Sequence, residues 1–421
     1  MKPFELANLK KVVEPLLESS ERIIEEKKQY WYPLGFAGYG VEEVIEALDT
    51  LCSFRTTMWK KTRDFEQMFA AEQRCEDAVM VNSGSSADLL LSFLLTNPSQ
   101  PLLRKGDEIL VPVVTWPTQI WSAMMAGLKV RFVDVDSSTL NIDVDDLEQK
   151  LSPTTKAIFL VHLMGNPCPM DRILEIAKTH NLLILEDCCE ALGAEWDGIR
   201  VGNFGLGGSF SFFFSHHLTT MEGGMITCSN SAVRDHLRVL RAHGWMRNVD
   251  SSNHNLDGYD GDSRYAFVNW GFNVRPTEIQ AAFGLHQLGK LSIFCKHREK
   301  LATRFFSFID RTQVFSRPRV ESLAKPSWFG LPLLVKETAP FSRNEIVNYL
   351  EAEGVETRSI LAGNVLRQPV ARFFDEFPNG SFPGGDAVHN RGFYIGLSPL
   401  MPVKIIDRLI ETFENFISQH A

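Results

Sequence analysis

The 421-residue chain lacks several features that would assign it to large classes of proteins. No stretch approaches the roughly 18 consecutive apolar residues of a membrane-spanning helix. The charged N-terminal residues 1–28 contain no signal-peptide core. The seven cysteines are scattered and include no C-x-x-C pair. We therefore expect a soluble protein of the reducing cytoplasm that is not bound to a membrane.

An excess of positive charge is also absent. The chain has 43 Lys and Arg residues against 52 Asp and Glu residues, which gives a net charge of −9. This balance argues against binding to nucleic acid or to an anionic membrane surface. An anionic ligand would have to be held by a local pocket.

The chain does contain the material of an α/β protein, since 44% of its residues are hydrophobic and short apolar runs alternate with amphipathic stretches. Such an alternation predicts a mostly parallel sheet with helices on both faces, and ligands of these sheets gather at the carboxyl ends of the strands. We expect residues 1–290 to form an N-terminal segment and a large domain, and residues 291–421 a smaller α+β domain. The expected strands of the large domain are 78–81, 108–112, 130–135, 157–165 and 182–187.

Three segments of the large domain carry side chains suited to chemistry. In VNSGSSADLLL, an apolar strand turns into a helix at Gly84, Ser85 and Ser86, and the free amides of a helix start can hold a phosphate. The alternative is an ordinary strand-turn-helix connection with a serine cap. In LLILEDCCEALG, Asp187 ends a strand and could pair with a protonated ring nitrogen, or merely cap the next turn.

The third segment, SFFFSHHLTTMEGG, contains the adjacent residues His216 and His217. Neutral imidazole is the usual proton carrier near pH 7, although without the neighbouring context a structural role is the default interpretation of such a histidine. Adjacent side chains diverge and no nearby Cys, His and Asp set has zinc-ligand spacing, so we predict no metal site.

In this order, the three segments resemble the pyridoxal-phosphate-dependent sugar aminotransferases, the DegT-type branch of the aspartate aminotransferase fold (fold type I). The resemblance extends from TTMWKKTRDFEQMFA through GFNVRPTEIQAAFG to TRSILAGNVLRQP. In that family a lysine six residues before the acidic residue of E-G-G forms a Schiff base with the cofactor. Counting back from Glu222 gives His216, and the chain has no lysine between Lys178 and Lys290.

Histidine at this position is typical of a small group in the family, the sugar 3-dehydratases that use pyridoxamine 5'-phosphate. One type acts on GDP-4-keto-6-deoxymannose in colitose biosynthesis. The other acts on CDP-4-keto-6-deoxyglucose and carries an iron-sulfur cluster, for which several thiolates are needed. This chain has no cysteine from Ser229 through Phe294. The resemblance therefore favours the type without a cluster.

The resemblance implies a role for each candidate residue. His216 would move the proton, and Asp187 would pair with the pyridinium nitrogen of pyridoxamine or pyridoxal phosphate. Trp116 would stack on the ring, and Glu190, where these aminotransferases usually have Gln, would contact the region of the ring hydroxyl. The phosphate would be held by Gly84, Ser85 and Ser211, and by Asn273 of a neighbouring subunit, which makes the active site a property of a homodimer.

The implied reaction is removal of the C3 hydroxyl of a nucleotide-linked 4-keto-6-deoxyhexose in 3,6-dideoxysugar biosynthesis, with glutamate restoring the amine of the cofactor. Candidates for the nucleotide diphosphate and sugar are His243, Arg247, Arg358 and Arg367, because guanidinium groups suit phosphate. Three alternatives remain open: a CDP-sugar dehydrase without a cluster, a nucleotide-sugar aminotransferase, and an inactive regulatory or binding homologue.

Overall fold

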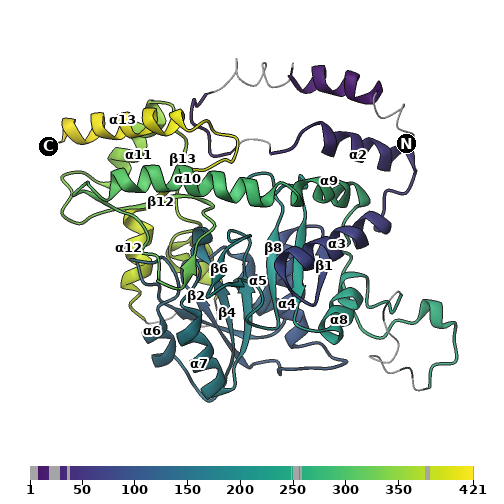
Figure 1. The fold of residues 1–421 in the computed structure, drawn as a ribbon. Helices are drawn as coiled ribbons and strands as arrows, with labels where there is room; N and C mark the ends of the chain where they lie inside the picture. Colours follow the sequence, from purple (N-terminus) through teal and green to yellow (C-terminus); the bar gives the residue numbers. More distant parts are fainter. Residues whose placement is uncertain are drawn as a thin grey trace.

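A seven-stranded sheet forms the centre of the molecule in this computed structural model, which describes residues 8–18, 29–35, 38–247, 249, 256, 258–374 and 380–420 (Figure 1). Its strand order is β1-β9-β8-β5-β4-β2-β3. β9 is antiparallel to both of its neighbours, whereas the other pairs are parallel, so six strands run in one direction. The strands are β1 (Asp77–Val81), β2 (Glu108–Pro112), β3 (Lys129–Val133), β4 (Thr155–Val161), β5 (Leu183–Asp187), β8 (Gly207–Ser211) and β9 (Gly224–Cys228).

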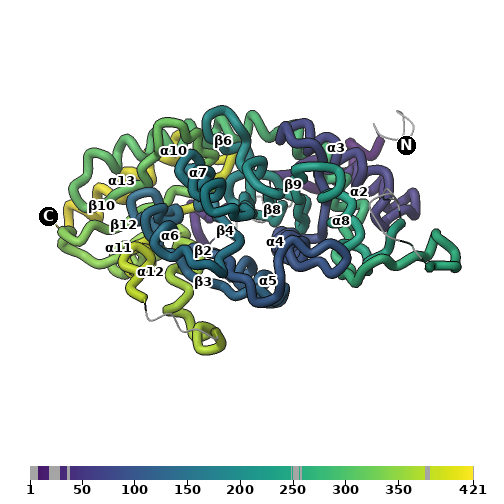
Figure 2. Tube along the Cα trace, turned by 90° about the horizontal axis from the view of Figure 1, so that it is seen from below, coloured from purple at the N-terminus to yellow at the C-terminus, as the bar shows by residue number. Residues whose placement is uncertain are grey.

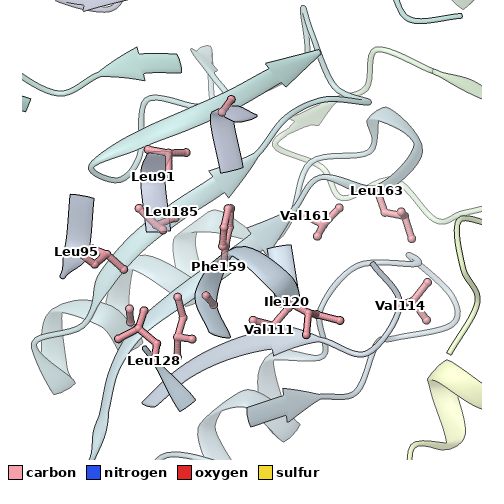
Figure 3. Close-up of a cluster of buried hydrophobic side chains, with 14 of the residues drawn as sticks. Leu91, Leu95, Val111, Val114, Ile120, Leu128, Phe159, Val161, Leu163 and Leu185 are labelled. Atoms are coloured by element: carbon pink, nitrogen blue, oxygen red, sulfur yellow. The ribbon is translucent and has the colours of Figure 1, made fainter. Parts of the chain in front are cut away.

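Helices cover both faces of this sheet because its strands bury side chains on both faces. On one face, α4 (Gly84–Leu95) inserts Leu91 and Leu95 against Leu185 and Phe159 of the strands (Figure 3). The other face packs against α7 (Met170–His180). The remaining helices of this region are α5 (Thr118–Met125), α6 (Val144–Gln149) and α8 (Ser231–Arg241).

A second, antiparallel sheet lies in the C-terminal part of the chain, with strand order β10-β12-β14-β13. Figure 2 shows α11 and α13 at one end of the molecule and α8 at the other. The elements of the C-terminal part are β10 (Phe315–Ser316), β12 (Gly330–Val335), α11 (Arg343–Ala352), β13 (Thr357–Arg358), α12 (Pro383–Arg391), β14 (Gly392–Gly396) and α13 (Lys404–Gln419).

Two consecutive helices connect the sheets. α9 (Glu278–Leu288) packs on α2 (Val41–Cys52) and α3 (Lys60–Gln73), and α10 (Leu291–Ile309) follows after a break at Gly289 (Figure 1). A three-stranded sheet of β11 (Ala324–Lys325), β6 (Glu195–Trp196) and β7 (Ile199–Arg200) also joins the two parts of the chain.

The C-terminal part also contacts the large sheet through α12, where the amides of Gly384 and Gly385 donate hydrogen bonds to Asp134. Conversely, Tyr32 from the N-terminal part is buried in the core of the second sheet and donates a hydrogen bond to the carbonyl of Gly396. We propose a domain boundary near residue 290. The contacts of α12 with Asp134 and of Tyr32 with Gly396 cross this boundary.

The predicted α/β pattern with a mostly parallel sheet is confirmed. One predicted strand, 157–165, is too long. The strand ends at Val161, and Leu163–Gly165 form a short 3-10 turn in which Met164 has a φ of 55°. The stretch 247–269, rich in Asp, Asn, Ser and Gly, is expected from its composition to be a long loop, and part of it lies outside the described residues. No described helix is long and apolar enough to cross a membrane.

Candidate active site

The carboxyl ends of the strands bring the predicted site residues to one edge of the sheet. Asp187 is the last residue of β5, and Ser211 the last residue of β8. Gly84 follows β1, and Trp116 follows β2. Since these strands run in the same direction, residues from four distant segments of the chain meet at this edge.

Gly84 and Ser211 form a close-fitting cradle at the start of α4. A Cβ atom on Gly84 would lie 2.7 Å from Cβ of Ser211 and 3.0 Å from Sγ of Cys189, so no side chain fits there. Ser83 caps the helix by accepting a hydrogen bond from the amide of Ser86. The amides of Gly84 and Ser85 have no acceptor within the helix, which suits them to an anionic group.

Asp187 is buried, and both of its carboxylate oxygens accept hydrogen bonds. Nε2 of Gln119 donates to Oδ2 at 3.0 Å, and the amide of Cys189 donates to Oδ1 at 2.8 Å. Burial raises the pKa of Asp187. Among the described residues no lysine or arginine forms an ion pair with this carboxylate, so a positively charged ring nitrogen would suit it.

Gln119 and Asp88 were missed at the sequence level. Asp88 is buried in α4 and accepts hydrogen bonds from the hydroxyls of Thr118 and Ser209. Burial, and secondarily the negative charge of Asp187, raises the pKa of Asp88 well above its ordinary value. The available signal was an acidic residue inside the apolar run SADLLL. Nothing local in the sequence pointed to Gln119.

Glu190 is also buried, and its Oε2 accepts a hydrogen bond of 2.9 Å from the amide of Met164. Burial raises the pKa of Glu190 to about 8, although the amide of Met164 lowers it in part and Asp187 raises it further. Glu190 is therefore protonated at pH 7 and can donate a hydrogen bond, as the amide of glutamine does.

His216 lies in the loop after β8, against residues of the C-terminal part. Its ring centroid is 5.1 Å from that of Phe329, and its carbonyl accepts a hydrogen bond from the guanidinium of Arg298. The amide of Phe329 in turn donates a hydrogen bond to the carbonyl of Met164, and the amide of Met164 donates one to Glu190. This series of contacts connects His216 with the edge of the sheet that carries Asp187.

The pKa of His216 is lowered to about 3, mainly because burial penalises the charged ring and secondarily because of the positive charge of Arg298. The imidazole is therefore neutral at pH 7 and can accept a proton. Neither Arg298 nor Phe329 was predicted, because both belong to segments more than eighty residues away from His216.

The other predicted residues near this edge have different environments. The side chain of Trp116 is 53% exposed, as an open stacking surface requires. Arg358 pairs with Glu356 and lies opposite Tyr394 in the second sheet. Arg367 donates two hydrogen bonds to Asp386, so this guanidinium already has an anionic partner.

Asn273, His243 and Arg247 belong to a different region. Asn273 and Arg247 line a cavity of about 600 Å³ that is lined by none of Gly84, Asp187 and His216. Arg275 also lines this cavity. It donates a hydrogen bond to Oδ1 of Asn273 and lies 3.4 Å from Nε2 of His243. Further arginines in the lining make the cavity basic: Arg55, Arg63, Arg238 and Arg241.

One group of metal-ligand residue types lies beneath the edge of the sheet, where His162, Glu186 and Cys188 are buried together. Nε2 of His162 is 3.1 Å from Oε2 of Glu186, and Nδ1 of His162 accepts a hydrogen bond from the amide of Cys168. Both ring nitrogens are thus engaged within the protein. We interpret this group as a structural hydrogen-bond network.

Comparison with known proteins defines the class to which this fold and site belong. Residues 39–414 match the DegT/DnrJ/EryC1/StrS aminotransferase family, and the chain belongs to that family. The family expected from the sequence is therefore confirmed.

Among relatives, a GDP-4-keto-6-deoxy-D-mannose 3-dehydratase of Yersinia pseudotuberculosis is 37% identical over 374 residues, which are 87% of this chain and 93% of that protein. The structure of the Escherichia coli GDP-4-keto-6-deoxy-D-mannose-3-dehydratase with bound hydrated PLP is 35% identical, with a TM-score of 0.86 over 91% of this chain and 99% of that one.

A GDP-4-keto-6-deoxymannose-3-dehydratase with a trapped PLP-glutamate geminal diamine is 35% identical, also with a TM-score of 0.86, over 90% of this chain and 99% of that one. The fold of this chain is thus the aminotransferase-type α/β fold of these enzymes, as predicted.

Proposed function

We propose that this chain is a pyridoxamine-5'-phosphate-dependent 3-dehydratase, a lyase that removes the C3 hydroxyl of a nucleotide-linked 4-keto-6-deoxyhexose. We favour GDP-4-keto-6-deoxymannose as the substrate, because the relatives described above carry that activity in their names. The observation that carries the proposal is His216, a neutral imidazole that contacts Phe329, in a chain with no lysine between Lys178 and Lys290.

The residues at the edge of the sheet fit this cofactor. The cradle of Gly84, Ser85 and Ser211 suits its phosphate, because a helix start offers free amides and the absence of a side chain on Gly84 lets Ser211 lie against that helix start. Asp187 suits the protonated ring nitrogen, because it is a buried carboxylate with no described lysine or arginine as an ion-pair partner. Trp116 would lie against the ring, and protonated Glu190 would contact the region of its hydroxyl.

When bound, the cofactor supplies an amine that condenses with the C4 ketone and a ring that accepts electrons. The protein provides the side chains that hold the cofactor and move protons. Asp187 would hold the proton on the ring nitrogen. His216, as a neutral base, would move the proton from the C4′ carbon of the cofactor to the departing C3 hydroxyl, which leaves as water. Because the segment between Lys178 and Lys290 has no lysine to hold the aldehyde form, glutamate would be able to restore the amine.

We further propose a homodimer in which the basic cavity around Asn273 completes the site of the partner. Asn273 and Arg247 line that cavity, whereas Asp187 and His216 do not, which supports a site completed by a second subunit. The arginines would bind the nucleotide diphosphate. A cytoplasmic location agrees with seven free cysteines.

The test is to incubate the protein with pyridoxamine phosphate, glutamate and GDP- or CDP-4-keto-6-deoxyhexose and to identify the sugar by mass spectrometry and NMR. We expect a 4-keto-3,6-dideoxy sugar together with 2-oxoglutarate. A 4-amino sugar would show an aminotransferase instead. A protein that retains no form of vitamin B6 would support an inactive homologue.

A further inference from the structure

Three buried nitrogens without partners belong to residues that line a small cavity next to His216. These are Nδ1 of His216, Nδ1 of His217 and Nε of Arg298, none of which has a hydrogen-bond partner among the described residues. All three residues line a cavity of about 10 Å³. A space of this size holds about one water molecule, and a buried water needs two to four polar partners.

The hydrogen-bond roles of two of these nitrogens follow from their neighbours. Nε of Arg298 always carries a hydrogen, so it can only donate. Nε2 of His217 lies 2.9 Å from the carbonyl of Ser327, which can only accept, so Nε2 carries the hydrogen. Burial, assisted by Arg298, lowers the pKa of His217 well below its ordinary value, so the ring is neutral and Nδ1 is an acceptor.

A water in this cavity would donate one hydrogen to Nδ1 of His217 and would accept one from Nε of Arg298. One hydrogen and one lone pair of the water remain, so it can pair with Nδ1 of His216 in either tautomer. Because Nδ1 is buried, only Nε2 can act on a ligand, and Nε2 is a base only when the hydrogen of the neutral ring is on Nδ1.

We propose that Arg298 and His217 are positioning residues for His216: through one ordered water they hold its hydrogen on Nδ1 and leave the lone pair of Nε2 to the active site. The guanidinium also fixes the loop, since it donates to the carbonyls of Phe329 and His216. This inference rests on the proposed role of His216 as the base.

The direct test is neutron diffraction from crystals of the full chain with pyridoxamine phosphate. We expect one water within hydrogen-bond distance of the three nitrogens and a deuteron on Nδ1 of His216. A dry cavity, or a deuteron on Nε2 with a bare Nδ1, would overturn the inference. This readout does not require turnover.

The kinetic test uses Arg298→Met and His217→Phe. We expect kcat for loss of the C3 hydroxyl to fall on the order of tenfold to a hundredfold, as for other residues that orient a reacting group, while KM for the nucleotide sugar changes less than about twofold. Arg304→Met on the same helix is the matched control, because Arg304 lies half-exposed against Asp407. It should leave both constants unchanged.

Arg298→Lys and ¹⁵N NMR keep the test decisive if Arg298→Met does not fold. Lysine keeps the charge but not the Nε donor, so the ¹⁵N shifts of His216 should show a mixture of tautomers. Unchanged shifts together with wild-type kcat would refute the positioning role. If the wild-type protein itself makes no deoxygenated sugar, the proposed function fails, while diffraction still decides the tautomer.

Discussion

Nε2 of Gln119 donates a hydrogen bond of 3.0 Å to Oδ2 of Asp187, and this contact joins the start of α5 to the end of β5. The bond holds the carboxylate in one orientation beneath the site. An amide donor also leaves the negative charge of Asp187 unneutralised, so that charge remains to stabilise a protonated ring nitrogen.

Replacement of Gln119 by leucine should weaken this support. One buried carboxylate oxygen would lose its donor, at a cost of about 1–3 kcal/mol. We expect weaker retention of pyridoxamine phosphate and a smaller loss of kcat than in Asp187→Asn, where removal of the charge should cost on the order of 10²–10³ in kcat. Equilibrium dialysis and steady-state kinetics measure both effects. Gln313→Leu, at an exposed position, is the control.

Gly84→Ala should damage the phosphate cradle. The new Cβ would lie 2.7 Å from Cβ of Ser211, and such overpacking costs about 1–3 kcal/mol. We expect weaker binding of the cofactor and a lower melting temperature, of which only the melting temperature should partly recover in Gly84→Ala/Ser211→Gly. Gly289→Ala should be nearly neutral, since its nearest neighbour would be 3.7 Å away. Equal effects at Gly84 and Gly289 would contradict the cradle.

Glu190→Gln should extend activity to higher pH. The pKa of about 8 means that wild-type Glu190 ionises as the pH rises through 8, which places a negative charge beside Asp187. We expect similar kcat at pH 7 and a slower decline above pH 8 in the variant. A pH profile that matches the wild type at every point would exclude a neutral Glu190.

Glu190→Gln should also stabilise the folded protein, by an amount that depends on pH. In the unfolded chain Glu190 ionises near pH 4.5, so the folded state loses stability between about pH 4.5 and 8. The melting temperature of Glu190→Gln relative to the wild type should therefore rise over that range and level off above it. Glu411→Gln, at an exposed position of α13, should show no such trend.

His216→Lys should change the reaction itself. Loss of the neutral base should suppress loss of the C3 hydroxyl on the order of 10²-fold or more, and the new amine should bind the aldehyde form of the cofactor covalently. Borohydride reduction followed by mass spectrometry detects the link. Phe214→Lys, two residues away, should form none. Undiminished dehydration by His216→Lys would refute the role of His216.

Mixed dimers test the shared site. Asn273→Ala and His216→Asn should each be nearly inactive alone, but subunits mixed by co-expression should regain activity, because one site of each mixed dimer then has both residues. Asn273→Ala mixed with Arg275→Ala should not recover, since both changes affect the same cavity. Absence of recovery in the first pair would place Asn273 outside the partner's site.

Local patterns in the sequence determined much of this protein. The alternation of apolar runs defined the parallel sheet, and strand ends followed by polar residues placed Gly84 and Asp187 at one edge. The resemblance to the family, counted back from Glu222, identified His216, and the absence of lysine between Lys178 and Lys290 excluded a covalent link from that segment. These features can be recognised from the order of residues along the chain.

The tertiary structure decided which distant residues set the chemistry of those side chains. Gln119 reaches Asp187 from another helix, and Arg298 and Phe329 reach His216 from the C-terminal part. The neutral state of His216 arises from burial first and from Arg298 second. Burial and contacts between distant segments depend on how helices and strands pack together. The local spacing of apolar residues predicts the helices and strands but not these contacts.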